Sequence, residues 1–181
     1  DADAVTRVKG ALADINRLDQ SFIERLTVVR GDLAAPLLGL TEAVFQDLCI
    51  SVAAIIHCGA KVNFLSSYED LEQANVGSTR ELIRMASRGR PKALHYISSL
   101  SVFPRDESRK SGYVESDDVL DRPPETENGY ILTKWASEKL VQEARRRRIP
   151  CVIYRLGLIT ADSQTGFCNP ADLVYRLIQV I

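Results

Sequence analysis

The stretch Ala93-Leu94-His95-Tyr96-Ile97-Ser98-Ser99 decides the fold class. Its first five residues form a short, mostly apolar run, and the run ends in two serines. Short apolar runs of this kind are typical of strands that are buried on both faces of a parallel sheet. The stretch therefore predicts a strand of such a sheet.

Similar runs recur along the chain and alternate with longer amphipathic segments. The other predicted strands are Leu26–Val29, Ala53–Cys58 and Cys151–Leu156. The predicted helices are Thr41–Val52, Tyr68–Ser87 and Tyr130–Arg148. This alternation indicates an α/β fold, a doubly wound parallel sheet with helices on both faces. Ligands bind such sheets at the carboxyl ends of the strands. Those ends are Gly31-Asp32, Gly59-Ala60, Ser98-Ser99 and Gly157.

Length and composition fit one domain. The 181 residues carry a formal net charge of -1, and 45% are hydrophobic and 26% charged. Proteins that bind nucleic acid through its phosphates are normally clearly basic, and a membrane span needs about 20 mostly apolar residues in a row. The start, Asp1–Arg7, lacks the basic flank and the apolar stretch of a signal peptide. We therefore expect a cytoplasmic protein that binds neither nucleic acid nor a membrane.

The cysteines do not form a metal-binding pattern. They lie at positions 49, 58, 151 and 168 without a CxxC pair, and only two histidines accompany them. Zinc sites use closely spaced pairs of ligands. We expect reduced thiols that pack as small hydrophobic side chains, and no metal site.

Tyr130 and Lys134 form a YxxxK motif on a predicted helix, downstream of the strand that ends in serine. The spacing places the phenol and the ammonium on one helical face. A tyrosine pKa is about 10, and a nearby lysine cation lowers it towards the range useful at neutral pH. With a serine hydroxyl to hold the substrate oxygen, the set suits reduction of a carbonyl or oxidation of an alcohol. A YxxxK alone is also compatible with a core tyrosine beside a solvated lysine.

Further motifs surround this pair in a definite order. They are Arg30–Leu33, Ile55–Asn63, Asn75–Thr79, Tyr96–Val102 and Tyr154–Gly166. With the YxxxK motif they resemble the extended short-chain dehydrogenase/reductase superfamily. Within it, the chain is most similar to the thioester reductase domains of nonribosomal peptide synthetases and carboxylic acid reductases. The last motif, with Asn169 and Asp172 beyond it, favours these over sugar epimerases. The resemblance implies a Rossmann-like, NAD(P)-binding domain.

The resemblance also implies site residues. The implied catalytic residues are Ser99, Tyr130, Lys134 and Asn75. The implied cofactor-binding residues are Asp32, Leu33, Gly59, Ala60, Lys61, Tyr130, Lys134, Leu156 and Gly157. Lys134 would bind the nicotinamide ribose and lower the pKa of Tyr130. Three residues have structural alternatives: Ser99 can cap its strand, Asp32 can form a turn, and Asn75 can tie helix to strand instead of completing a proton relay.

Two features depart from the family pattern. The chain has no GxGxxG, the glycine-rich turn that binds the cofactor pyrophosphate, and Leu156 stands where the family usually has Pro. We therefore expect a partial domain over residues 1–181, without the first strand-helix-strand and most of the C-terminal substrate region. The Leu26–Val29 strand would then pair with Ala53–Cys58, borrow another chain or stay unpaired.

The implied activity is hydride transfer from NADPH, less favourably NADH, to an acyl or peptidyl thioester. The thioester would be held on the phosphopantetheine arm of a carrier protein, and an aldehyde, or after a second hydride an alcohol, would be released. The alternatives are a fatty acyl-CoA reductase, a nucleotide-sugar epimerase and a non-catalytic NADP-binding module. A further possibility is that the 181-residue chain is inactive by itself.

Overall fold

The computed structural model of the chain describes residues 2–14, 20–104, 112–115, 117, 122–169 and 172–180. The chain divides into two compact units, one of residues 1–30 and 158–181 and the other of residues 31–157. All the residues expected in the site belong to the second unit.

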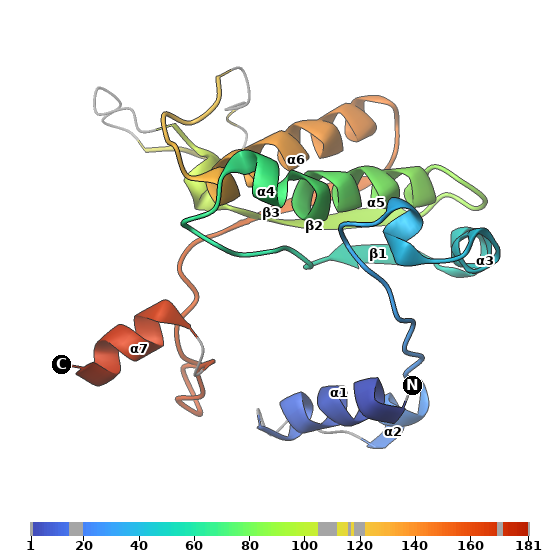
Figure 1. The fold of residues 1–181 in the computed structure, drawn as a ribbon, viewed down its shortest axis with the longest axis horizontal. Coiled ribbons are helices and arrows are strands. Elements are labelled where there is room, and N and C mark those ends of the chain that lie inside the picture. Colours follow the sequence, from blue (N-terminus) through green and yellow to red (C-terminus); the bar gives the residue numbers. More distant parts are fainter. Residues whose placement is uncertain are drawn as a thin grey trace. The chain divides into compact units, whose positions relative to one another are not determined.

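Three parallel strands form the sheet of the second unit (Figure 1). They are β1 (Ala54–His57), β2 (Ala93–Ser99) and β3 (Cys151–Leu156), in the order β1-β2-β3. His57 pairs with Tyr96, and Ser99 pairs with Leu156, so the carboxyl ends of the strands lie along one edge of the sheet. The predicted α/β fold with a parallel sheet is confirmed, as are the strands predicted at these three places.

The predicted helices of this unit are also confirmed. They are α3 (Glu42–Ser51), α4 (Tyr68–Glu72), the π-helical turn η2 (Gln73–Gly77), α5 (Ser78–Ala86) and α6 (Gly129–Arg146). Short 3-10 turns lie at η1 (Pro36–Gly39) and η3 (Leu100–Val102). The Thr41 hydroxyl accepts a hydrogen bond from the Val44 N–H to cap α3, and Ser67 and Asp70 form a capping box at α4. The single helix predicted over 68–87 is the continuous series α4, η2 and α5.

One face of the sheet packs against these helices, with α4, α5 and α6 lying together on that side (Figure 1). The buried core contains residues from the sheet and from α3, α5 and α6: Phe45, Cys49, Ile55, Met85, Ala86, Leu94, Tyr96, Val141, Ala144 and Cys151. On the other face Ile56 is 70% exposed and Val152 42% exposed. Within the described part of residues 31–157, helices therefore cover one of the two faces that we expected to be covered.

The prediction of a strand at Leu26–Val29 is wrong. Residues 26–30 have no regular secondary structure and belong to the first unit. A strand depends on a ladder of hydrogen bonds to a neighbour. Among the described residues β1 pairs only with β2, so no ladder reaches this segment, and the unpaired arrangement is the one observed.

The first unit contains helices that the sequence patterns did not reveal. They are α1 (Ala2–Asp14), α2 (Gln20–Glu24) and α7 (Leu173–Val180). No helix in the described ranges has the length and apolar character needed to cross a membrane.

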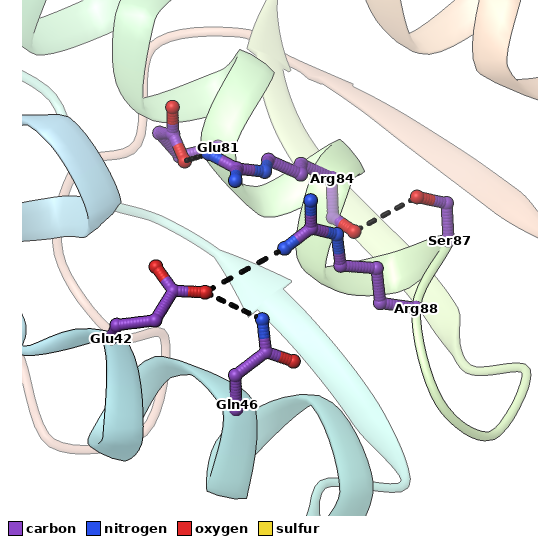
Figure 2. A network of polar contacts seen from close by, with 6 residues as sticks. All are labelled: Glu42, Gln46, Glu81, Arg84, Ser87 and Arg88. Atoms are coloured by element: carbon purple, nitrogen blue, oxygen red, sulfur yellow. Dashed lines mark hydrogen bonds and ion pairs between the residues drawn. The ribbon is translucent and has the colours of Figure 1, made fainter.

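A polar network joins α3 to the end of α5 (Figure 2). Gln46 Nε2 donates to Glu42 Oε1 at 2.7 Å, and Arg88 Nη1 lies 4.0 Å from the same oxygen. The Glu42 side chain is 61% exposed and that of Arg88 38% exposed. Water therefore screens the charges, and the ion pair should contribute little to stability.

We expect Arg88→Ala to lower the free energy of unfolding by less than about 1 kcal/mol, because an exposed pair is lost and the apolar core beneath it is unchanged. Urea denaturation of the variant and the wild type measures the difference. A loss of several kcal/mol would show instead that this pair holds α3 onto α5.

Candidate active site

The first turn of α6 is held by the loop that follows β1. Asn128 caps the helix, because its Oδ1 accepts from the Ile131 N–H at 3.2 Å. Its Nδ2 donates to the Phe64 carbonyl oxygen at 3.4 Å. The Tyr130 ring meets the Phe64 ring edge to face, with centroids 5.4 Å apart. The cap and the tyrosine therefore contact the same loop residue, which limits how Tyr130 can move.

Lys134 lies one turn further along the same face of α6 and is 5% exposed. Its ammonium donates to the Ile97 carbonyl oxygen at 2.8 Å. It lies 5.1 Å from the ring centroid of Tyr96 and 5.9 Å from that of Tyr130. An ammonium has three donors, and among the described residues Lys134 uses one. A buried cation with spare donors lies between α6 and the end of β2.

Burial changes the pKa values of both side chains. It lowers the pKa of Lys134 to about 8, partly opposed by the nearby Cys58 thiol. It raises the pKa of Tyr130 above 10.0. The expectation that the lysine lowers the tyrosine pKa is therefore wrong for this structure, because desolvation of the phenol dominates and the ammonium bonds to Ile97. Tyr130 is protonated at neutral pH and can act as a proton donor.

Ser99 is the last residue of β2 and caps the turn η3 that follows. Its Oγ accepts from the Ser101 N–H at 3.1 Å and lies 3.2 Å from the Ser101 hydroxyl, to which it donates. This is the capping role that we considered as its alternative. Among the described side chains no hydrogen bond joins Ser99 to Tyr130 or Lys134. The link between them runs through Ile97, two residues before Ser99.

Asn75 is buried in the π-helical turn η2, a form that often marks functional sites. Its Oδ1 accepts from the Lys61 N–H at 2.7 Å, and its Nδ2 donates to the Lys61 carbonyl at 3.1 Å and to the Thr133 hydroxyl at 3.0 Å. Thr133 in turn donates to the Tyr130 carbonyl oxygen at 2.8 Å. Both amide donors are used within the protein. This geometry favours the structural alternative, in which Asn75 ties the loop after β1 to α6.

Apart from Tyr130 and Lys134, the residues expected to bind the cofactor form two groups. In the first, the Leu33 side chain covers Gly59, where an added Cβ would lie 3.0 Å from Leu33 Cδ1. Ala60 and Lys61 follow Gly59 along the chain, and Asn75 holds the Lys61 backbone. Asp32 Oδ1 accepts from the Ala34 N–H at 2.8 Å, which is the turn contact of its alternative role.

The second group lies at the end of β3. Leu156 pairs with Ser99, and a Cβ on Gly157 would lie 3.3 Å from Leu100 Cδ1. The sheet thus brings Ser99, Leu156 and Gly157 together. Helix α6 brings Tyr130 and Lys134 to β2, the strand that ends at Ser99.

The sequence patterns missed three residues of this site, which are Gly129, Phe64 and Thr133. Gly129 begins α6, and an added Cβ would overlap the Ser67 carbonyl carbon. An Asn followed by Gly directly before the YxxxK motif is an N-cap signal that marks this helix start. The contact of Phe64 with Tyr130 has no comparable signal, because the two residues are far apart in the chain.

Comparisons with known proteins identify the family of the chain. A model of the NAD-binding family described as "Male sterility protein" matches residues 1–181. The chain belongs to this family.

Two relatives of the chain are much longer proteins. The chain is 37% identical over 175 residues to a subunit of linear gramicidin synthase from Brevibacillus parabrevis. It is 38% identical over 176 residues to glycine betaine reductase ATRR of Emericella nidulans. These matches cover 97% and 96% of the chain but only 3% and 14% of the relatives. The chain therefore spans a small part of the curated proteins that it matches.

Solved structures of reductase domains match the chain as well. The terminal R domain from the myxalamid PKS-NRPS biosynthetic pathway matches with a TM-score of 0.91 and 42% identity, over 98% of this chain and 44% of that one. The reductase (R) domain of a nonribosomal peptide synthetase from Mycobacterium tuberculosis matches with a TM-score of 0.69 and 28% identity, over 91% and 40%. The resemblance to thioester reductase domains is confirmed, and so is the Rossmann-like, NAD(P)-binding fold.

The buried His57 beside this site should make stability depend on pH. Its Nε2 lies 3.1 Å from the Thr79 hydroxyl, and burial, helped by the Lys134 charge, lowers its pKa from 6.5 to about 4. The unfolded chain therefore binds more protons than the folded one between these values. The contribution of His57 to stability is complete above pH 6.5 and is lost as the pH falls towards 4.

We expect this histidine to reduce the free energy of unfolding by roughly 2 kcal/mol between neutral pH and about pH 5. Denaturant unfolding at a series of pH values measures the slope, and His57→Gln, which does not titrate, should flatten it in this range. A His57→Gln profile as steep as that of the wild type would assign the acid sensitivity to other groups.

Proposed function

We propose that this chain is the catalytic part of a nicotinamide-dependent reductase. Its substrate is an acyl or peptidyl thioester on the phosphopantetheine arm of a carrier protein, its product is an aldehyde, and its reductant is NADPH in preference to NADH. Its location is the cytoplasm. The observation that carries this proposal is the face of α6 on which a protonated Tyr130 and a buried, donor-rich Lys134 lie beside the end of β2.

The residues at this edge fit a nicotinamide cofactor. Lys134 keeps two donors for ribose hydroxyl groups, and its burial makes those hydrogen bonds stronger than they would be in water. The remaining residues proposed to hold the cofactor are Asp32, Leu33, Gly59, Ala60, Lys61, Leu156 and Gly157. When bound, NADPH would supply the hydride.

The chain's own residues would manage the proton and the developing charge. Tyr130 would donate its phenolic proton to the thioester oxygen as hydride adds to the carbonyl carbon, and Ser99 would donate a hydrogen bond to that oxygen. The resulting thiohemiacetal would break its C–S bond, which releases the aldehyde and the free thiol of the carrier arm.

The relatives support a carrier-bound substrate. The relative in Brevibacillus parabrevis is named as part of linear gramicidin synthase, and the 42% identical R domain comes from a PKS-NRPS pathway. Peptide synthetases hold their intermediates as thioesters, as the resemblance from the motifs implies. The relatives therefore favour a thioester substrate over a sugar nucleotide.

The experiment uses the protein at its natural length. Calorimetric titration with NADPH and NADH measures cofactor affinity, and product analysis follows turnover of an acyl thioester on a phosphopantetheine carrier, an acyl-CoA and a nucleotide sugar. We expect tighter binding of NADPH and aldehyde release from the carrier thioester. Reaction of the acyl-CoA alone or of the nucleotide sugar alone would favour those alternatives. Saturable binding without any turnover would identify a non-catalytic module.

A further inference from the structure

A buried ion pair lies on α6 one turn beyond Lys134. Tyr130, Lys134 and Glu138 are spaced by four residues and share one face of the helix. Glu138 is fully buried, and its Oε1 accepts from Arg155 Nε at 2.9 Å and from Arg155 Nη2 at 2.6 Å. The Arg155 side chain is 12% exposed. The Glu138 charge is therefore removed from water, and the Arg155 charge largely so.

The pair also contacts Ser98, directly before Ser99, and Phe103, four residues after it. Glu138 Oε2 accepts from the Ser98 hydroxyl at 2.6 Å, and Ser98 is the direct partner of Arg155 across β2 and β3. The Arg155 guanidinium lies 4.8 Å from the ring centroid of Phe103, the residue that follows η3. Ser99 itself is not a member of this network. Ser99 lies between Ser98 and Phe103. The network fixes Ser98 through a hydrogen bond and Phe103 through contact with its ring.

Stability alone does not explain such a pair. Two charges lose their hydration when they are buried, and well-packed apolar residues in the same place are often as stable or more stable. The pair fixes the relative position of three elements. A carboxylate with three short hydrogen bonds allows only one placement of α6, β2 and β3. Those are the elements that carry Tyr130 and Lys134, Ser99, and Leu156.

We propose that Glu138 and Arg155 are positioning residues, which set Ser99 and the turn after it relative to Tyr130 and Lys134. This inference rests on the proposed reductase function. Neither side chain contacts the substrate or the cofactor in this account. They act on the reaction through the placement of Ser99, so their loss should lower kcat while cofactor affinity stays unchanged.

The test replaces the whole pair, because removing one partner leaves an unpaired buried charge and destabilises the fold. In Glu138→Met/Arg155→Met we expect a melting temperature close to that of the wild type and an NADPH Kd within about twofold. We expect kcat for the carrier thioester to fall by about 10²-fold, the size of loss that a displacement of about 1 Å can cause. The single variant Glu138→Gln should be clearly less stable than the double variant.

A matched control lies at the C-terminal end of the same helix. Glu143 and Arg147 form an exposed i, i+4 pair at 2.8 Å, and Glu143→Met/Arg147→Met should leave both kcat and the Kd unchanged. Ser98→Ala, which removes a single hydroxyl, gives a second test if the double variant does not fold. It should lower kcat by about tenfold at an unchanged Kd.

A kcat equal to that of the wild type in the folded Glu138→Met/Arg155→Met variant would overturn the inference. If that variant does not fold, a kcat equal to that of the wild type in Ser98→Ala would overturn it. A loss of kcat that follows only the fraction of protein unfolded would also overturn it, because the pair would then be structural. A wild-type protein without thioester turnover would overturn the proposed function, and with it this inference. That outcome is seen before any variant is made.

Discussion

Tyr130→Phe should lower thioester turnover by about 10³-fold and leave NADPH affinity within about twofold of the wild type. The change removes the phenolic hydroxyl that we propose as the proton donor, and it keeps the ring that packs on Phe64 with centroids 5.4 Å apart. Because burial raises the pKa of Tyr130, the hydroxyl is a donor at neutral pH and has no charge to lose from the fold. Single-turnover kinetics and a cofactor titration on the same variant measure the two effects separately.

Tyr154→Phe is the matched control. The Tyr154 hydroxyl lies 2.9 Å from His95 Nδ1, and the side chain is part of the exposed face of the sheet. This variant loses a tyrosine hydroxyl without touching α6, and its turnover should equal that of the wild type. Equal turnover in Tyr130→Phe and the wild type would remove Tyr130 from the proposed mechanism.

Gly129→Ala should destabilise the protein by about 3 kcal/mol and reduce turnover in the fraction that folds. An added Cβ would overlap the Ser67 carbonyl carbon and lie 2.5 Å from the Ser66 carbonyl oxygen. Both atoms are backbone, so they cannot rotate away as a flexible side chain would. Either the loop before α4 or the first turn of α6 must shift, and Tyr130 follows Gly129 directly. Denaturant unfolding and kcat/KM measure the two consequences.

Gly77→Ala provides the control for this substitution. Gly77 also has helical geometry, and its added Cβ would lie 3.3 Å from the far end of the Gln73 side chain, which can move. We expect a change of less than about 1 kcal/mol and unchanged turnover. If Gly129→Ala behaves like Gly77→Ala, the close contact of α6 with Ser66 and Ser67 does not constrain the site.

The strands and α6 could be predicted because their signals are local. The apolar run that ends at Ser99 and the YxxxK of α6 depend on neighbours within a few residues, and the structure confirms both elements. Leu26–Val29 has the same local character but forms no strand. Pairing is a property of two segments, and no strand in the described residues pairs with this one.

The residues that form the site were easier to predict than their chemical behaviour in it. The pattern placed Tyr130 and Lys134 on one face correctly, but the pKa of Tyr130 depends on how deeply the phenol is buried, and this follows from the packing around α6. The Asn75 amide was open to two roles because its partners, Lys61 and Thr133, lie on other segments. Glu138 carried no signal at all. A glutamate on a helix is usually exposed, and only the fold shows Arg155 and Ser98 around it.

We propose that this site delivers hydride from a nicotinamide to a thioester carbonyl carbon. The most direct test uses the protein at its natural length, NADPH with deuterium at both C4 positions of the nicotinamide, and an acyl thioester on a phosphopantetheine carrier. We predict one deuterium at the aldehyde carbon of the released product and one free carrier thiol for each aldehyde. Aldehyde without deuterium, or oxidation of NADPH with the thioester left intact, would contradict the account.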